Sequence, residues 1–360
     1  MRFAAIDRHV RITFVLPKSA SGGTLVIKTY ARFLAGRGHR VVLVSPPEPE
    51  RRPWLSWTRR LLSPKLCQST IDDHGIEHRV LERSRPIVDA DVPDADVVIA
   101  TWWETAEWVS VLSDSRGRKC HFVQGYEVYP WLPQQRARAV YRLPLRRIVI
   151  SQWLADIIRS SYGDGSAVLV LNGVDHDEFH AVSRSKQKRP TVGFLYSEVP
   201  FKNLDASLVM LESLKTRLPD LRVLTFGFES PGRRLPSYVE FVTNPPRPNL
   251  REIYASCDVW ISASTSEGFN MPTSEAMACR TPVVAFPTGW PAHALVSGVN
   301  GECVELGDFA AFERATERLL RFPEEDWRRC SAQAYETARH LSWERSGLAF
   351  ERALANLYAA

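Results

Sequence analysis

Short apolar runs recur along the chain and predict buried strands separated by amphipathic helices. Two such runs lie near the start, at 10–16 and 41–44, and the residues at 24–36 between them form an interrupted apolar face. This spacing predicts a strand, a helix and a second strand. That order is typical of a βαβ unit in a parallel sheet, so the pattern predicts an α/β fold.

The same alternation continues to the end of the chain. Further strands are predicted at 97–100, 120–123, 148–150, 168–171, 191–196, 221–226, 238–242, 259–263 and 283–286. Helices are predicted at 203–218, 250–256 and 273–279, and others beginning near 309, 323 and 342. A length of 360 residues suggests two domains, and a polar, basic stretch at 181–190 is typical of the linker between them.

The stretch 258–287 is the most informative part of the chain. It predicts a strand, a polar loop, a helix with Pro272 as its first residue, and a second strand. Gly268 and Asn270 in the loop both tolerate backbone angles that most residues resist. The amides from Gly268 through Phe269 to Met271 would then converge at the helix start, where phosphate binds well.

Two carboxylates bracket this predicted anion site, Glu267 before it and Glu275 in the expected first helical turn. A carboxylate repels phosphate but accepts hydrogen bonds from hydroxyl groups, so this layout suits a nucleotide-sugar. In the simpler alternative, Glu275 is only an acid near a helix N-terminus and Glu267 a solvated loop residue.

The string E-G-F-N-M-P-T-S-E, with its flanking strands, resembles the E-x7-E motif of the retaining glycosyltransferases of family 4, which have the GT-B fold. Their usual form begins Glu-Gly-Phe-Gly, and Asn270 replaces the second glycine. The resemblance implies two Rossmann-like domains facing across a cleft. It places an acceptor-binding domain at 1–180, a nucleotide-sugar-binding domain at 181–340, and a C-terminal helix at 341–360 packed back on the first domain. It implies no cofactor and no metal.

The resemblance also assigns roles in the second domain. Lys202 and the amides of Gly268, Phe269, Asn270 and Met271 would hold the donor diphosphate, Glu267 would orient sugar hydroxyls, and Glu275 would hold the ribose. Relatives carry an arginine six residues before the lysine, and that position is Tyr196 here. Arg247 is the candidate to replace it.

In the first domain, candidate acceptor or cleft residues follow predicted strands. They are Gly22, Gly23, Trp102, Gln124 and Glu127. The carboxyl ends of parallel strands are where such sheets bind ligands. Many family members have a histidine near the position of Gln124, and a neutral amide cannot replace its proton chemistry. A tight turn is the simpler explanation of the two glycines.

Composition excludes several classes of protein. A hydrophobic fraction of 44% and a charged fraction of 24% are those of a soluble globular protein. A net charge of +5 is too modest to indicate nucleic-acid binding. No apolar run approaches the ~20 residues that span a bilayer, and the N-terminus has no signal-peptide core. Six scattered cysteines without a C-x-x-C pair fit a reducing cytoplasm.

Two segments mix basic with aromatic or apolar residues. Residues 51–66 interleave arginines with two tryptophans, and 131–147 carry five arginines without an acid. Either segment could contact an anionic membrane or a lipid-linked acceptor. Packing of 51–66 on its own domain and a solvated helix face at 131–147 are the alternatives.

Taken together, the sequence predicts a retaining glycosyltransferase that moves a sugar from a nucleotide-diphosphate donor to a glycan or lipid-linked acceptor. Thr-Trp-Trp-Glu-Thr-Ala at 101–106 and Phe-Val-Gln-Gly-Tyr-Glu at 122–127 resemble bacterial rhamnosyltransferases and suggest a deoxysugar. The expected role is bacterial cell-surface polysaccharide synthesis, in the cytoplasm or at the inner face of the membrane. The alternatives are a catalytically weak GT-B subunit serving a partner enzyme and a sugar-nucleotide 2-epimerase.

Overall fold

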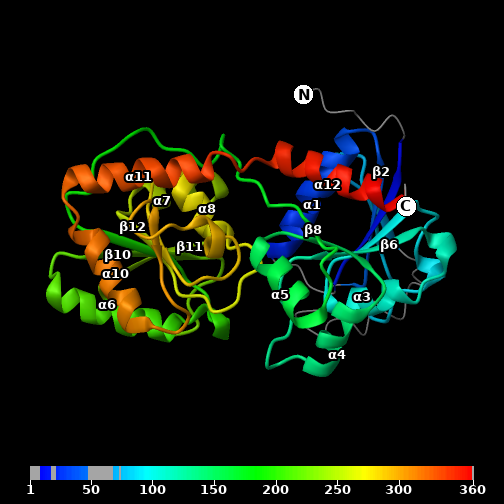
Figure 1. Cartoon of the computed structure of the whole chain (residues 1–360), viewed down its shortest axis with the longest axis horizontal. Helices are drawn as coiled ribbons and strands as arrows, with labels where there is room; N and C mark the ends of the chain where they lie inside the picture. Colours follow the sequence, from blue (N-terminus) through cyan, green and yellow to red (C-terminus); the bar gives the residue numbers. More distant parts are fainter. Residues whose placement is uncertain (1–8, 18–21, 48–67, 73, 359–360) are drawn as a thin grey trace, which may run out of the picture. The chain divides into compact units, whose positions relative to one another are not determined.

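The computed structural model describes residues 9–17, 22–47, 68–72 and 74–358, and the basic segment 51–66 lies outside them. Internal contacts divide the chain into two compact units. The first holds the described residues up to Ile150, together with Leu154–Val170 and the chain from Glu344. The second holds Ser151–Trp153 and Leu171–Trp343. Each unit has its own sheet, covered by helices (Figure 1).

The first unit is built on an eight-stranded sheet with the order β3-β4-β2-β1-β5-β6-β7-β8. Its strands are β1 (Arg11–Val15), β2 (Arg40–Ser45), β3 (Gln68–Ile71), β4 (Glu77–Val80), β5 (Val97–Ala100), β6 (Arg118–Val123), β7 (Arg146–Val149) and β8 (Val168–Leu169). All neighbours are parallel except β3 and β4. The carboxyl ends of β1, β5 and β6 therefore meet at one edge, where loops carry candidate site residues.

The helices of the first unit are α1 (Gly22–Gly36), α3 (Trp103–Ser110), α4 (Gln134–Ala139), α5 (Gln152–Tyr162) and α12 (Trp343–Tyr358), with the short 3-10 turns η2 (Asp89–Asp91), η3 (Asp114–Arg116) and η4 (Val140–Arg142). The last helix, α12, lies far from the others in sequence but is part of this core. Its Phe350 ring lies 4.5 Å from Tyr30 of α1 and 5.0 Å from Phe122 of β6, centroid to centroid. The buried Glu351 accepts a 2.9 Å bond at its Oε1 from His39 Nε2.

The second unit is built on a six-stranded parallel sheet with the order β11-β10-β9-β12-β13-β14. Its strands are β9 (Thr191–Leu195), β10 (Arg222–Gly227), β11 (Val239–Thr243), β12 (Val259–Ser262), β13 (Val283–Ala285) and β14 (Gly301–Cys303). The strand order reverses between β9 and β12. Ligands of such sheets bind beside this switch point, at the carboxyl ends of the strands.

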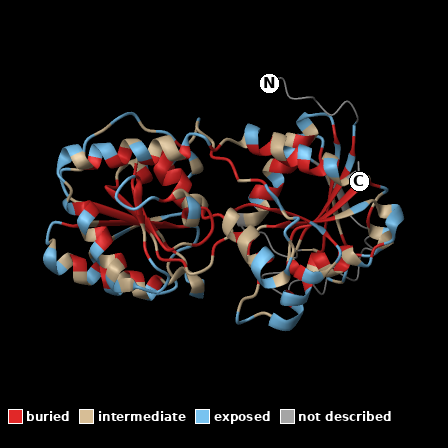
Figure 2. Cartoon of the chain, viewed as in Figure 1, coloured by how far each residue is buried: buried red, intermediate tan, exposed pale blue. Residues whose placement is uncertain are grey.

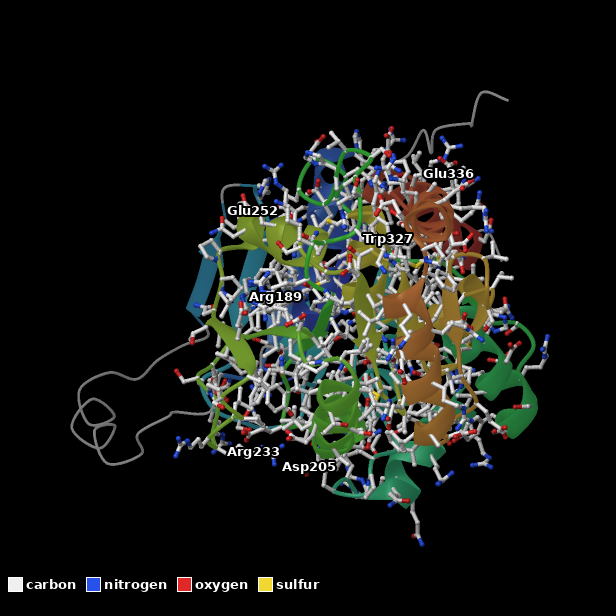
Figure 3. All side chains as sticks on the ribbon, turned by 90° about the vertical axis from the view of Figure 1, so that its left-hand side faces the viewer. Arg189, Asp205, Arg233, Glu252, Trp327 and Glu336 are labelled. Carbon is white, nitrogen blue, oxygen red and sulfur yellow. The ribbon has the colours of Figure 1, made fainter. Side chains whose placement is uncertain are left out.

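Helices cover both faces of this second sheet (Figure 1). They are α6 (Leu204–Arg217), α7 (Leu250–Ala255), α8 (Met271–Ala278), α9 (Pro291–Ala294), α10 (Phe309–Arg321) and α11 (Glu324–Ala338), with the 3-10 turns η5 (Pro200–Lys202) and η6 (Arg247–Asn249). The inner strands β9, β10, β12 and β13 are the most deeply buried part, whereas the edge strand β11 is only partly covered (Figure 2). Trp327 of α11, labelled in Figure 3, is fully buried, and its indole N–H donates to the Asp258 carbonyl at 2.9 Å.

The strand and helix pattern of the sequence is confirmed, with several corrections. The polar strands β3 and β4 were missed, because neither carries an apolar run. β14 was taken for a turn, since it is three residues long and starts at Gly301. Residues 101–105 were expected to form a loop, but α3 already begins at Trp103. Gly22 and Gly23 were expected before a helix and instead form its first turn.

Two searches bear on function. No helix among the described residues is both long and apolar enough to cross a membrane. No group of three or more His, Cys, Asp or Glu side chains suited to hold a metal ion occurs in the described part of the chain. Two short strings in the described residues, at 89–91 and 94–96, have the letters D-x-D of a metal motif, but Asp91 pairs with Arg85 and Asp96 with Arg11.

Close packing of α12 on α1 predicts that Gly347→Ala destabilises the first unit. A Cβ at Gly347 would lie 2.4 Å from the Phe33 ring, so the two helices must separate. Overpacking of this kind costs about 1–3 kcal/mol. Chemical denaturation followed by circular dichroism measures the loss. Gly36→Ala at the end of α1 is the control, because nothing lies within 4 Å of its Cβ. Equal stability of the two variants would contradict this packing.

Candidate functional site

The loop between β12 and α8 is the centre of the candidate site in the second unit. Asn270 is the N-cap of α8, with a left-handed backbone at φ 75° and ψ 62°. Its Nδ2 donates to Ser262 Oγ at 2.8 Å, which fixes the side chain against the end of β12. Asparagine tolerates this conformation better than most residues, which explains why it can replace a glycine. Gly268 was also expected to need unusual angles, but its φ is not positive.

The backbone amides of this loop are free to bind an anion. No described residue accepts a hydrogen bond from the N–H groups of Gly268, Phe269 or Asn270. α8 is capped by the Asn270 carbonyl, which accepts from Thr273 N at 3.1 Å. Free N–H groups at the positive end of a helix attract phosphate. This arrangement suits an anion, and the donor-binding role of these amides stays a prediction.

The loop is held from its other side by the turn after β13. Phe269 is buried and stacks on Trp290, with ring centroids 5.9 Å apart. Its carbonyl accepts a 2.8 Å hydrogen bond from Trp290 N. Gly289 in this turn has φ 65°, and a Cβ there would lie 2.8 Å from the Phe269 carbonyl oxygen. The close approach therefore requires glycine at position 289.

A short ion pair joins the two predicted catalytic residues. Lys202 Nζ lies 2.5 Å from Glu267 Oε1, and the side chains are only 20% and 10% exposed. Lys202 ends η5, which is tied to the loop after β12, since Thr265 N donates to the Phe201 carbonyl at 2.9 Å. Lys202, Ser262 and Asn270 line one pocket of the second unit. This cation therefore lies beside the β12–α8 loop and is held in place by a carboxylate.

Glu275, the second predicted carboxylate, is buried beside α7. It is the fifth residue of α8 and so lies just past the first turn, because the helix begins at Met271, one residue before the predicted start at Pro272. Tyr254 Oη of α7 donates to its Oε2 at 2.7 Å. Burial raises the pKa of the Glu275 carboxyl, and the Tyr254 hydrogen bond and the Arg247 charge oppose that rise only in part. A buried carboxylate with one satisfied oxygen is suited to accept from ligand hydroxyls.

Tyr254 was missed from the sequence, although its helix was predicted. Nothing in the local pattern links position 254 to Glu275, which is 21 residues later. Met271 is positioned by another distant contact, since Asn172 Nδ2 lies 3.8 Å from its Sδ.

Relatives have an arginine at the position of Tyr196, and Arg247 is its candidate replacement. Both side chains already have partners. Tyr196 replaces the expected arginine, and its hydroxyl donates a short hydrogen bond to Glu198. Arg247 pairs with Glu178 and lies over the Phe179 ring at 5.0 Å. Burial and the hydrogen bond to Glu198 raise the pKa of Tyr196. Arg233 lies 2.5 Å from Asp205, and Figure 3 labels both residues.

In the first unit, one predicted cleft residue supports the fold. Glu127 is buried, and its Oε2 accepts a 2.7 Å bond from Trp103 N at the start of α3. The backbone N–H of Glu127 donates to Tyr141 Oη at 3.0 Å. Burial raises the pKa of the Glu127 carboxyl. Trp102 is the half-buried N-cap of α3. Gln124 is half-buried, and its Oε1 has no hydrogen-bond partner among the described residues.

The part of the chain that holds this site is similar to known proteins. Residues 175–337 match the family described as Glycosyl transferases group 1. Those residues include η5, the β12–α8 loop and Glu275. A D-inositol 3-phosphate glycosyltransferase of Thermomonospora curvata is 34% identical over 106 residues, 29% of this chain. A GDP-mannose-dependent phosphatidylinositol monomannoside mannosyltransferase of Mycolicibacterium smegmatis is 28% identical over 218 residues, 51% of this chain.

Solved structures cover almost the whole chain. A sucrose-phosphate synthase from Thermosynechococcus elongatus has a TM-score of 0.75 at 17% identity, covering 98% of this chain and 100% of its own. Anabaena HepE in complex with UDP-glucose has a TM-score of 0.72 at 16% identity and covers 98% of this chain and 100% of its own. The fold is GT-B. The chain has two α/β units, each with its own sheet of mainly parallel strands, as the sequence predicted.

The reach of the sequence matches is limited. The chain spans from 24% to 57% of the length of the curated relatives just described. The match is concentrated in the second unit of the GT-B fold, where the loop, Lys202 and Glu275 lie. The roles of individual site residues therefore remain proposals.

The raised pKa of Glu275 predicts a pH-dependent gain in stability for Glu275→Gln. The protonated carboxyl stabilises the wild type fully below its ordinary pKa of 4.5, and this contribution is lost as the pH rises through the higher folded-state pKa. Glutamine cannot ionise but can still accept from Tyr254. The difference in unfolding free energy, variant minus wild type, is therefore expected to increase from pH 4 to pH 8.

Urea denaturation at several pH values measures this difference. The control is Glu305→Gln, an exposed loop position in the same unit, where the difference should stay constant. A flat difference for Glu275→Gln would contradict the assignment of a raised pKa.

Proposed function

We propose that this GT-B protein is a retaining glycosyltransferase that uses a nucleotide-diphosphate sugar as donor. The observation that carries the proposal is the cluster at the carboxyl end of β12. Free amides at the start of α8, Lys202 and two buried carboxylates occur together in the part of the chain that matches Glycosyl transferases group 1. Amides and a cation suit a diphosphate, and the carboxylates suit the hydroxyls on either side of it.

The proposed chemistry is stabilisation of the leaving group. The bond from the anomeric carbon to the diphosphate breaks while the acceptor oxygen bonds to the same face of the sugar. Lys202 and the amides of Gly268–Asn270 hold the negative charge that develops on the diphosphate. The acceptor proton passes to the departing phosphate oxygen. Glu267 orients sugar hydroxyls, Glu275 holds the ribose, and the step needs no metal or cofactor.

The donor and acceptor are proposed as classes. One relative is named as GDP-mannose-dependent, and structures with a similar fold contain UDP-glucose or ADP, which supports a nucleotide-sugar donor. The strings at 101–106 and 122–127 favour a deoxysugar such as rhamnose. A glycan or lipid-linked acceptor is supported by the named phosphatidylinositol mannoside acceptor of one relative. We place the reaction in bacterial cell-surface polysaccharide synthesis, in the cytoplasm or at the inner face of an anionic membrane.

One observation favours the alternative of a catalytically weak GT-B subunit. At the position of a diphosphate-binding arginine, Tyr196 instead donates to Glu198, and so a carboxylate lies beside the position. Loss of one charged hydrogen bond weakens binding by about 1.5–3 kcal/mol. A subunit of this kind would bind nucleotide-sugar or glycan for a partner enzyme without transferring the sugar itself.

The proposal predicts that two substitutions in the donor site impair different steps. Lys202→Ala should lower kcat by about 10²–10³, because a charge that stabilises the leaving group is lost. Glu275→Ala should mainly weaken donor binding, by about tenfold or more, through loss of a charged hydrogen bond. Isothermal titration with UDP-, GDP-, ADP- and dTDP-sugars, with and without EDTA, measures binding, and product analysis measures transfer or donor hydrolysis.

Lys188→Ala is the matched control, since Lys188 is an exposed lysine of the same unit with no contact to the site. Full activity of Lys202→Ala would refute the assigned role. Donor binding without transfer or hydrolysis would favour the subunit alternative. Conversion of the donor without any acceptor would instead indicate an epimerase.

A further inference from the structure

A group of arginines without carboxylate partners lies on the first unit. Of the five arginines between Trp131 and Arg147, Arg136 pairs with Glu107 and the buried Arg147 pairs with Asp164. Arg138, Arg142 and Arg146 are exposed, and no described carboxylate forms an ion pair with them. These charges are therefore available to an anionic ligand.

Two of the free arginines meet at a pair of tyrosines. Arg138 Nη1 of α4 donates to Tyr126 Oη at 3.2 Å. Tyr126 Oη lies 2.9 Å from Tyr162 Oη of α5. The guanidinium of Arg142, at the end of η4, lies over the Tyr162 ring at 5.1 Å from its centroid. Two cations from one short segment thus flank a single pair of hydroxyls.

The hydroxyl pair retains a hydrogen to donate. If Tyr126 donates to Tyr162, the Tyr162 hydrogen is left over. If Tyr162 donates, Tyr126 accepts from both Tyr162 and Arg138, and its own hydrogen is left over. In either arrangement no described residue accepts that last hydrogen. The cluster therefore offers a hydroxyl donor together with two guanidinium groups.

The tyrosines form a fixed support for these donors. Tyr141 is buried, and its ring centroid lies 5.6 Å from Tyr126 and 5.1 Å from Tyr162. Tyr141 Oη in turn donates to the Gly125 carbonyl at 3.1 Å, which ties the cluster to the loop after β6. The hydroxyls are therefore held in place before any ligand binds, which reduces the ordering cost of binding.

From this cluster we infer that the first unit has a phosphate-binding site formed by Arg138, Arg142, Tyr126 and Tyr162. Guanidinium groups bind phosphate oxygens in pairs, and a hydroxyl donor supplies one further bond. The ligand is a phosphate monoester or diester, on a soluble molecule or on a lipid headgroup. The exposed Trp131, stacked on Tyr129 at 4.9 Å, lies in the same segment and would suit the headgroup region.

The site does not depend on the transferase activity proposed above, and binding alone tests it. The probes are glycerol 3-phosphate, followed by isothermal titration, and phosphatidylcholine vesicles with or without phosphatidylglycerol, followed by co-sedimentation. The double variant Arg138→Gln/Arg142→Gln should weaken binding by about tenfold or more, because two charged hydrogen bonds are lost. Tyr162→Phe should weaken it less.

The matched control is Arg136→Gln/Arg159→Gln, which removes the same charge from α4 and α5 at arginines already paired with Glu107 and Asp156. Its affinity should stay within about twofold of the wild type, since exposed ion pairs contribute little. Circular dichroism confirms that both double variants are folded.

The two arms separate the sources of the phosphate. Variant-sensitive binding of glycerol 3-phosphate supports a site for a soluble phosphate ester. Variant-sensitive binding of phosphatidylglycerol vesicles alone supports a headgroup site. Absence of binding to both probes, or equal losses in the test and control variants, would overturn the proposal. Neither result depends on turnover, so failure here is distinct from failure of the transferase.

Discussion

The left-handed backbone of Asn270 is the constraint on which the candidate site of the second unit depends. It lets the chain turn into α8 directly after the amides of Gly268 and Phe269, which have no acceptor among the described residues. The turn is held on two sides, by Ser262 at the end of β12 and by Trp290 after β13. Both contacts come from the ends of β12 and β13, which are paired strands of one sheet, so the loop is fastened to that sheet on two sides.

Around this rigid loop the protein keeps charges in places that cost stability. Glu275 is buried with a raised pKa, and Glu267 depends on Lys202 to offset its own burial. Removing water from a carboxylate is unfavourable unless partners replace it. A fold selected for stability alone would place apolar residues here. Buried ionisable groups with perturbed pKa values or close charge partners cluster at functional sites, and this supports the proposed donor site.

The parts of the fold that repeat a local pattern could be predicted from the sequence. Buried parallel strands such as β12 are continuous apolar runs, and the glycine, asparagine and proline around α8 mark its start. Polar β3 has no such run, and it forms because it can pair with β4. The sequence also did not predict the partners of three site residues. Tyr254 and Glu178, the partners of Glu275 and Arg247, are distant in sequence. Glu198, the partner of Tyr196, lies in an irregular loop.

Glu127 shows why residue type at a strand end is a weak guide to chemistry. A carboxylate after β6 suggested a cleft residue, but the free N–H of Trp103 at the start of α3 uses it instead. The first N–H groups of a buried helix need hydrogen-bond acceptors, and Glu127 provides one of them. Glu127 is buried, whereas Arg138 and Arg142, which flank the Tyr126–Tyr162 pair, are exposed. The internal capping of α3 thus leaves a surface with positive charge and hydrogen-bond donors, which is the condition for binding an anion.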